Sequence, residues 1–256
     1  MCLITFAYKT HPKYSLILLA NRDEFYQRAS QAMHFWPDQS HVLAGRDLEQ
    51  MGTWLGINKA GKFSAVTNFR DGNNMTKSKK SRGELTANFL MGATDAKNYL
   101  AQLEKEKSQY GDFNLLTGDQ TGLYYCSNRG GQTQQLKPGV YGMSNALLDT
   151  PWPKLTQVKQ ALSDTIENEI ISEQVLFEIM LNDQHAADEC LPDTGVPFEW
   201  ERLLSSSFIR SETYGTRAIT LLLQGLDGYT TVIEQGYDYN GPLERSEYKL
   251  TLPVLG

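Results

Sequence analysis

The sequence has 256 residues, few cysteines and no surplus of positive charge. Three widely spaced cysteines, an odd number, make a disulfide framework improbable and suit a reducing compartment. The longest apolar runs, SLILLA and AITLLLQGL, are as long as strands and too short to span a bilayer. A net charge of −6 argues against general nucleic-acid binding, which requires a basic face.

Sequence motifs for the common cofactors are also absent. There is no CxxC, HExxH, P-loop or GxGxxG, and the first residues lack the pattern of a signal peptide. The histidines are scattered without metal-ligand spacing, at His11, His34, His41 and His185. We therefore expect a cytoplasmic protein with no membrane span, no nucleic-acid partner, no metal and no cofactor required for catalysis.

The order of the predicted elements indicates a single α+β domain over residues 1–256. Two strand-like runs, Cys2–Tyr8 and Tyr14–Asn21, are joined by KTHPK and predict a hairpin. A second hairpin is predicted around NKAGK. Further strands are predicted at 113–119, 123–128, 140–145, 217–224, 229–235 and 247–252, and helices after Ser81 and Thr94 and at 151–164 and 172–183. Consecutive hairpins imply antiparallel sheets, with the helices on their outer faces.

Cys2 directly follows the initiator methionine. Removal of Met1, favoured by a small second side chain, would give one residue both a thiol and an α-amino group. Their reference pKa values, about 8.5 and about 8, lie near neutrality, so the amine can take the thiol's proton and return it to a leaving group. The alternative is an inert thiol buried in a first strand, since free cysteine is among the most buried residue types.

Four polar or charged residues, Asn21–Glu24, follow the second apolar run. If the first two strands pair as a hairpin, Arg22 and Asp23 lie close to Cys2. A cation there lowers the pKa of a thiol, and a carboxylate can hold an α-ammonium group. The alternative is a surface turn with a weak local ion pair.

The MC start, followed by NRDEF after an apolar strand, resembles the NRDE family, also known as the transport and Golgi organisation protein 2 family. The resemblance continues through GTWLGINKAGKFSAVTNFR, SRGELTANFL, YGMSNALLDTPWPK and YGTRAITLLL, and so covers nearly the whole chain. Membership implies the four-layer αββα fold of the N-terminal-nucleophile hydrolases, in which helices flank two antiparallel sheets.

The sequence is also similar, more distantly, to the cysteine-dependent penicillin and bile-salt amidases of that superfamily. This resemblance implies that Cys2 is the nucleophile and that Arg22 is the arginine after the second strand. It places the catalytic aspartate at Asp23, although those enzymes have theirs a few residues beyond the arginine.

The same resemblance implies three further site residues. A later asparagine corresponds to Asn145 and a late arginine to Arg217, while the oxyanion-hole asparagine corresponds to Asn68, with Asn58 as a competitor. Amide donors can stabilise the charge that develops on a carbonyl oxygen, and Arg217 could bind a carboxylate or support the site without contacting the substrate. The alternatives are a turn former at Asn68, a helix N-cap at Asn145 and a strand-end cation at Arg217.

Two functions fit this pattern. The first is Cys2-dependent hydrolysis of an amide or thioester bond in a small hydrophobic acyl substrate. The second, implied by the family resemblance, is non-catalytic carriage of haem, or handling of acyl-coenzyme A or lipid, in the same pocket. A haem could take an axial ligand from one histidine or from the Cys2 thiolate. The basic segment Lys77–Arg82 is either a solvated loop or a cradle for phosphates or propionates.

Overall fold

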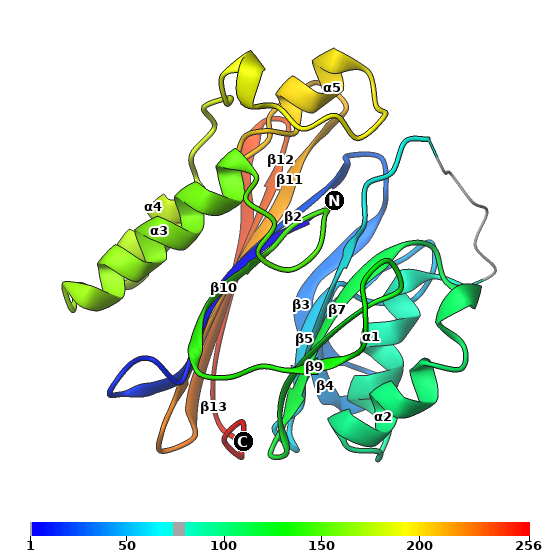
Figure 1. Cartoon of the computed structure of the whole chain (residues 1–256). Coiled ribbons are helices and arrows are strands. Elements are labelled where there is room, and N and C mark those ends of the chain that lie inside the picture. Colours follow the sequence, from blue (N-terminus) through cyan, green and yellow to red (C-terminus); the bar gives the residue numbers. More distant parts are fainter. Residues whose placement is uncertain (1, 74–79) are drawn as a thin grey trace.

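The computed structural model describes residues 2–73 and 80–256 (Figure 1). Its strands form two antiparallel sheets. One has the order β10-β1-β2-β11-β12-β13 and the other the order β3-β4-β5-β6-β7-β8-β9. The first sheet contains β1 (Cys2–Tyr8), β2 (Tyr14–Phe25), β10 (Gly139–Met143), β11 (Tyr214–Gly225), β12 (Tyr229–Asp238) and β13 (Gly241–Thr251). The second contains β3 (Ser30–Trp36), β4 (Gln39–Asp47), β5 (Leu55–Asn58), β6 (Phe63–Asn68), β7 (Phe113–Asp119), β8 (Gly122–Ser127) and β9 (Gln134–Gln135).

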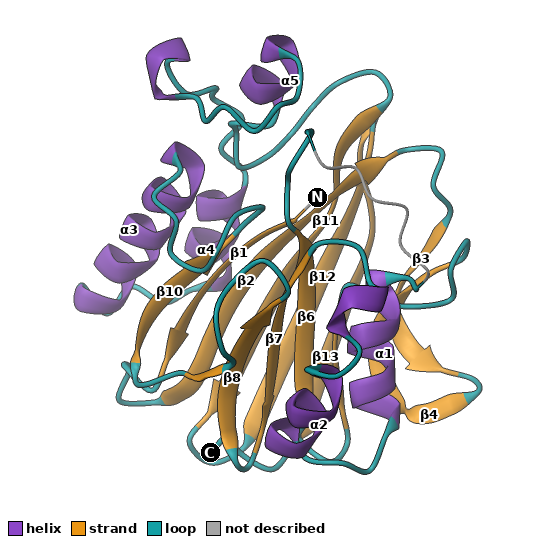
Figure 2. Cartoon of the chain, turned by 45° about the vertical axis from the view of Figure 1, so that its right-hand side comes forward, coloured by secondary structure: helices purple, strands orange, loops and turns teal. Residues whose placement is uncertain are grey.

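Helices cover the outer faces of both sheets (Figure 2). The covering helices are α1 (Arg82–Met91), α2 (Ala96–Leu103), α3 (Pro153–Glu167) and α4 (Glu173–Met180). Helix α5 (Phe198–Leu203) lies beyond one end of the sheets (Figure 1), and two short 3₁₀ turns are η1 (Lys107–Gln109) and η2 (Asp188–Cys190). One apolar core lies between the sheets, a second joins α1 and α2 to the seven-stranded sheet, and a third joins α3 and α4 to the six-stranded sheet. The predicted four-layer αββα arrangement is confirmed.

The predicted N-terminal hairpin is present, with β1 and β2 paired from Cys2 to Tyr8. The start of α1 is also as predicted, because Ser81 and Glu84 form a capping box. The cap predicted at Thr94 is wrong by one residue. The carboxylate of Asp95 accepts a hydrogen bond from the backbone N–H of Asn98 and caps α2 instead.

Strands β3 and β4 and helix α5 have no counterpart among the predicted elements. Two register shifts interrupt the β3–β4 pair, so the two-residue alternation that marks a half-buried strand is broken. Helix α5 has only six residues, too few for a helical periodicity to show. In the part of the chain that the structure describes, no helix is long and apolar enough to cross a membrane.

Candidate functional site

Cys2 and Arg22 are direct partners in the antiparallel pair of β1 and β2. Opposed residues in such a pair point their side chains to the same face, and the face alternates along each strand. Ile4 and Ala20, two positions further along, belong to the core between the sheets. The Cys2 thiol and the Arg22 guanidinium therefore face the space between the two sheets.

The guanidinium of Arg22 is held by groups that belong to the opposite layer. Its central carbon lies 4.2 Å from the ring centroid of Trp54, just before β5. Its Nη1 donates to Ser30 Oγ at 3.3 Å, and its Nη2 lies 3.9 Å from a carboxylate oxygen of Asp47. These contacts fix a buried positive charge beside Cys2, where it favours the thiolate.

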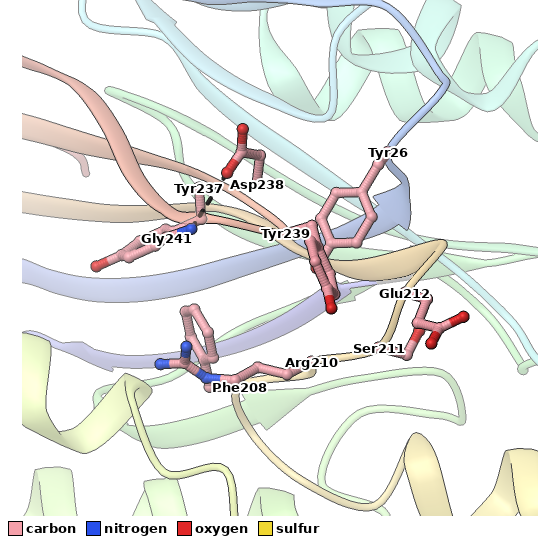
Figure 3. Close-up of a pocket in the computed structure, with 9 residues that line it drawn as sticks. All are labelled: Tyr26, Phe208, Arg210, Ser211, Glu212, Tyr237, Asp238, Tyr239 and Gly241. Carbon is pink, nitrogen blue, oxygen red and sulfur yellow. Dashed lines mark hydrogen bonds between the residues drawn. The ribbon is translucent and has the colours of Figure 1, made fainter.

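The thiol itself is enclosed. Cys2 is 9% exposed, and burial raises the pKa of its thiol, an effect opposed in part by the charge of Arg22. Two cavities in the described residues are not lined by Cys2. One, of about 310 Å³, is formed by aromatic rings and Arg210 at the turn between β12 and β13 (Figure 3). The other, of about 320 Å³, lies beside Tyr125 and Tyr141. At neutral pH this thiol needs a neighbouring base to become a nucleophile.

Asp23 follows Arg22 in β2, and its side chain lies on the opposite face of the sheet, toward the helices. Asn21, on the same face, donates to the carbonyl oxygens of Met180 and Ser207 at 2.9 and 2.7 Å. The Oδ1 atom of Asp23 accepts a hydrogen bond from Thr216 Oγ1 at 2.7 Å. Burial raises the pKa of this carboxyl, while the charge of Lys154 is the largest of those that lower it. Sequence reasoning placed Arg22 and Asp23 together beside Cys2, whereas the structure separates their side chains across the sheet.

Asn145 is fully buried just beyond β10, the other neighbour of β1. Its Nδ2 donates to both the backbone carbonyl and Oδ1 of Asn68, each at 3.0 Å. The preceding Ser144 donates through Oγ to the carbonyl oxygen of Cys2 at 3.4 Å. Asn145 is not the N-cap of α3, since that position is Trp152. The two asparagines expected in the site are thus joined to each other, close to the start of β1.

The direction of these bonds distinguishes the two amides. Both hydrogen bonds from Asn145 Nδ2 go to Asn68, whose Oδ1 accepts one of them. Within residues 2–73 and 80–256, no hydrogen-bond acceptor is recorded for Asn68 Nδ2. Asn145 therefore orients the side chain of Asn68, and the amide nitrogen of Asn145 is occupied by these two bonds.

The competitor Asn58 is the last residue of β5, and its side chain is fully hydrogen-bonded there. Its Nδ2 donates to the Leu90 carbonyl at 2.7 Å, and its Oδ1 accepts from the N–H groups of Ala60 and Lys62 at 2.9 and 3.0 Å. The residues of the turn after β5 approach Pro253, near the C-terminus. The structure does not bring Asn58 to Cys2.

Arg217 occupies an irregular position of β11, where the register with β2 shifts. Its Nη1 donates to the carbonyl oxygens of Phe25, Tyr26 and Arg28 at 3.0, 3.2 and 3.1 Å. Of the two roles expected for Arg217, these contacts are of the supporting kind, because the guanidinium binds backbone carbonyls at the end of β2 and just beyond it. In this conformation Arg217 supports the chain next to Arg22 and makes no recorded contact with Cys2.

Sequence reasoning missed three buried charged residues near the start of α3, namely Arg70, Lys154 and Glu201. Arg70 Nη2 lies 2.9 Å from Glu201 Oε2, and both side chains are at most 5% exposed. The Arg70 guanidinium also stacks on Trp152 at 4.5 Å, just before α3. Lys154, in the first turn of α3, is 2% exposed. The segment TPWPK showed only that a helix begins there, because a proline favours the first turn.

Part of the basic segment Lys77–Arg82 lies outside the described residues, namely positions 77–79. Of the rest, Lys80 Nζ pairs with Glu106 at 2.7 Å and Arg82 Nη1 donates to the Asp112 carbonyl at 3.2 Å. Arg82 is an exposed residue. These contacts leave an anion cradle as an untested prediction.

Glu234 is a buried carboxyl group between the sheets that sequence reasoning also missed. Its Oε1 accepts from the Met33 N–H at 2.6 Å, and its Oε2 accepts from Thr220 Oγ1 at 3.3 Å. Burial raises the pKa of Glu234 to about 7 from its usual 4.5. Between these two values the folded state holds a proton that the unfolded state has lost, so the free energy of unfolding falls as pH rises.

We expect Glu234→Gln to remove this dependence, because an amide keeps the shape and stays neutral. The variant should match the wild type near pH 4 and exceed its free energy of unfolding by on the order of 3 kcal/mol at pH 8. Urea unfolding at several pH values measures the difference. Glu244→Gln, at an exposed position of β13, is the matched control. If Glu234→Gln raises the free energy of unfolding equally near pH 4 and at pH 8, Glu234 does not titrate between these values.

Comparison with known proteins identifies the family. The family model described as Transport and Golgi organisation 2 matches residues 1–239. The chain belongs to this family. Curated members include the mouse protein, 35% identical over 256 residues, and the human protein, 36% identical over 256 residues, with 92% of each chain covered in both cases. The fruit-fly member is 28% identical over 271 residues, covering 94% of this chain and 95% of its own. The family predicted from the sequence motifs is therefore confirmed.

Two solved structures give partial matches to this chain. Penicillin V acylase from Agrobacterium tumefaciens gives a TM-score of 0.43 at 10% identity, covering 98% of this chain and 86% of that one. A mutant conjugated bile acid hydrolase from Clostridium perfringens gives 0.48 at 11% identity, covering 99% of both chains. Because both TM-scores are below 0.5, these matches support no statement about the function of this chain.

Proposed function

We propose that this member of the Transport and Golgi organisation 2 family is an N-terminal cysteine hydrolase. It cleaves an amide or thioester bond in a small hydrophobic acyl substrate. The observation that supports this most directly is the pairing of Cys2 with Arg22 at the end of the space between the sheets. Removal of Met1, which lies outside the described residues, is part of the proposal.

The first half-reaction uses both groups of the processed Cys2. The α-amino group takes the proton of the thiol, whose charged form Arg22 stabilises. The sulfur then forms a bond to the substrate carbonyl carbon, and the carbonyl oxygen becomes an oxyanion. Asn68 Nδ2, oriented by Asn145, donates to that oxygen. The α-ammonium group returns its proton to the departing amine or thiol as the C–N or C–S bond breaks.

The second half-reaction regenerates the enzyme. A water molecule gives a proton to the α-amino group and attacks the acyl-cysteine. The tetrahedral intermediate again places its oxyanion at Asn68. The carbon–sulfur bond then breaks, the carboxylic acid leaves and the sulfur regains its proton.

The test compares processed protein with a form that carries one extra N-terminal residue before Cys2. Both are treated with an S-octanoyl thioester and followed by intact mass. We expect the processed form to gain one octanoyl group on Cys2 and to lose it by hydrolysis, because only this form has the α-amino base. The extended form should remain unlabelled. Equal labelling of both forms, or none of the processed form, would contradict the proposal. Stoichiometric haem binding without acylation would instead support the carrier function.

A further inference from the structure

Lys154 is a charged side chain buried in the first turn of α3. It is 2% exposed, and its neighbour Leu155 packs with Leu3 of β1 in the core beneath the helix. The Nζ atom has no hydrogen-bond partner among the residues that the structure describes. Lysine is almost never buried in this way unless a charge nearby compensates for its lost hydration.

The neighbouring charge that acts most strongly on Lys154 is that of Asp23. Burial lowers the pKa of Lys154 to about 8, and among neighbouring charges Asp23 opposes this most strongly. Reciprocally, Lys154 is the largest charge that lowers the pKa of the buried Asp23 carboxyl. The other charged groups acting on Lys154 are Arg70, Cys2 and Glu201, and Glu201 is already paired with Arg70.

The arrangement of faces determines what Lys154 can act on. Asp23 and α3 lie on the helix side of the six-stranded sheet, where Thr216 donates to Asp23 Oδ1. The Cys2 thiol points to the other side, between the sheets. Lys154 is therefore placed to influence the carboxylate of Asp23, and it is poorly placed to take a proton from the sulfur.

We propose that Lys154 is a positioning residue that keeps Asp23 ionised, so that this carboxylate holds the α-ammonium group formed on processed Cys2. The inference rests on the proposed function, because it assigns a task to the amine that Met1 removal would release. Transfer of the thiol proton creates a positive charge on that amine, and an ionised Asp23 stabilises it. The positive charge of Lys154 lowers the free-energy cost of keeping the buried Asp23 carboxylate ionised.

The test uses processed Lys154→Met and Lys154→Arg proteins. Methionine fills the same space without a charge, and arginine retains the charge. The first measurement is the carboxyl titration of Asp23, followed by NMR of protein labelled at aspartate carbonyls. The second is the pH dependence of Cys2 acylation by the octanoyl thioester. We expect Lys154→Met to raise both midpoints by about one pH unit or more, and to slow acylation about tenfold or more below its midpoint. Lys154→Arg should retain midpoints close to the wild type.

A double variant tests whether the effect passes through Asp23. On an Asp23→Asn background, Lys154→Met should cause no further change in the acylation profile, since the group that it influences is gone. If Lys154→Met is still acylated and its Asp23 titrates as in the wild type, the inference is wrong, while the proposed hydrolase function is retained. A shifted Asp23 titration in a protein that never acylates would confirm that Lys154 acts on Asp23, but it would refute both the hydrolase and the task assigned to Lys154.

Discussion

Cys2→Ser is expected to reduce acylation at residue 2 by at least about a thousandfold. Serine is also small, so processing of Met1 should be retained, and the chain keeps its α-amino group. The hydroxyl, however, does not ionise near neutral pH, whereas a thiol does so readily enough for the neighbouring amine to deprotonate it. The measurement is the rate at which an octanoyl group appears on the N-terminal peptide, followed by mass spectrometry at pH 7.

Cys190→Ser is the matched control for this change. Cys190 is the exposed cysteine, while Cys126 is buried against α2. Labelling of Cys190 would report only general thiol reactivity, so its loss should leave acylation of Cys2 untouched. Retention of turnover in Cys2→Ser, or its loss in Cys190→Ser, would show that the nucleophile lies elsewhere.

Glu201→Ala should lower the free energy of unfolding by about 3–5 kcal/mol. The carboxylate of Glu201 pairs with Arg70 at 2.9 Å in a buried position and also accepts from the N–H and hydroxyl of Thr194 at 2.8 and 2.6 Å. Its removal leaves the Arg70 guanidinium charged and buried with no carboxylate partner, and an uncompensated buried charge is costly. Urea denaturation followed by tryptophan fluorescence measures the loss.

Glu199→Ala provides the comparison on the same short helix. Glu199 is largely exposed and pairs with Arg202 at 3.4 Å, so its removal should change stability by less than about 1 kcal/mol. The double variant Arg70→Met with Glu201→Leu should recover most of the stability lost in Glu201→Ala, because no charge remains buried. Similar losses for Glu199→Ala and Glu201→Ala would show that the buried pair contributes little.

The proximity of Cys2 and Arg22 could be predicted from the sequence because local geometry determines it. Cys2 and Arg22 lie on strands joined by a short turn, so the hairpin alone brings the end of one strand to the start of the other. The identity of the asparagines expected near Cys2 and Arg22 could be predicted only from the family resemblance. The structure then distinguished Asn68 from Asn58 by their hydrogen-bond partners.

The rest could not be read from the sequence, for identifiable reasons. Both faces of β2 are buried along most of its length, so its apolar run gives no alternation that would assign a face to Asp23. Arg70, Lys154 and Glu201 come from three distant segments, and each reads as an ordinary surface charge until the fold brings them together. The burial of these charged side chains depends on tertiary packing, so no pattern in the neighbouring sequence indicates it.

The link between Asn145 and Asn68 has a consequence for how activity would respond to partial unfolding. Asn145 follows a strand of one sheet and Asn68 ends a strand of the other, and Thr67 adds a second bridge by donating to the Ser144 carbonyl. In the proposed mechanism, the nucleophile Cys2 thus belongs to one sheet and the oxyanion donor Asn68 to the other. A small separation of the two sheets would therefore be expected to abolish the proposed activity before either sheet unfolds.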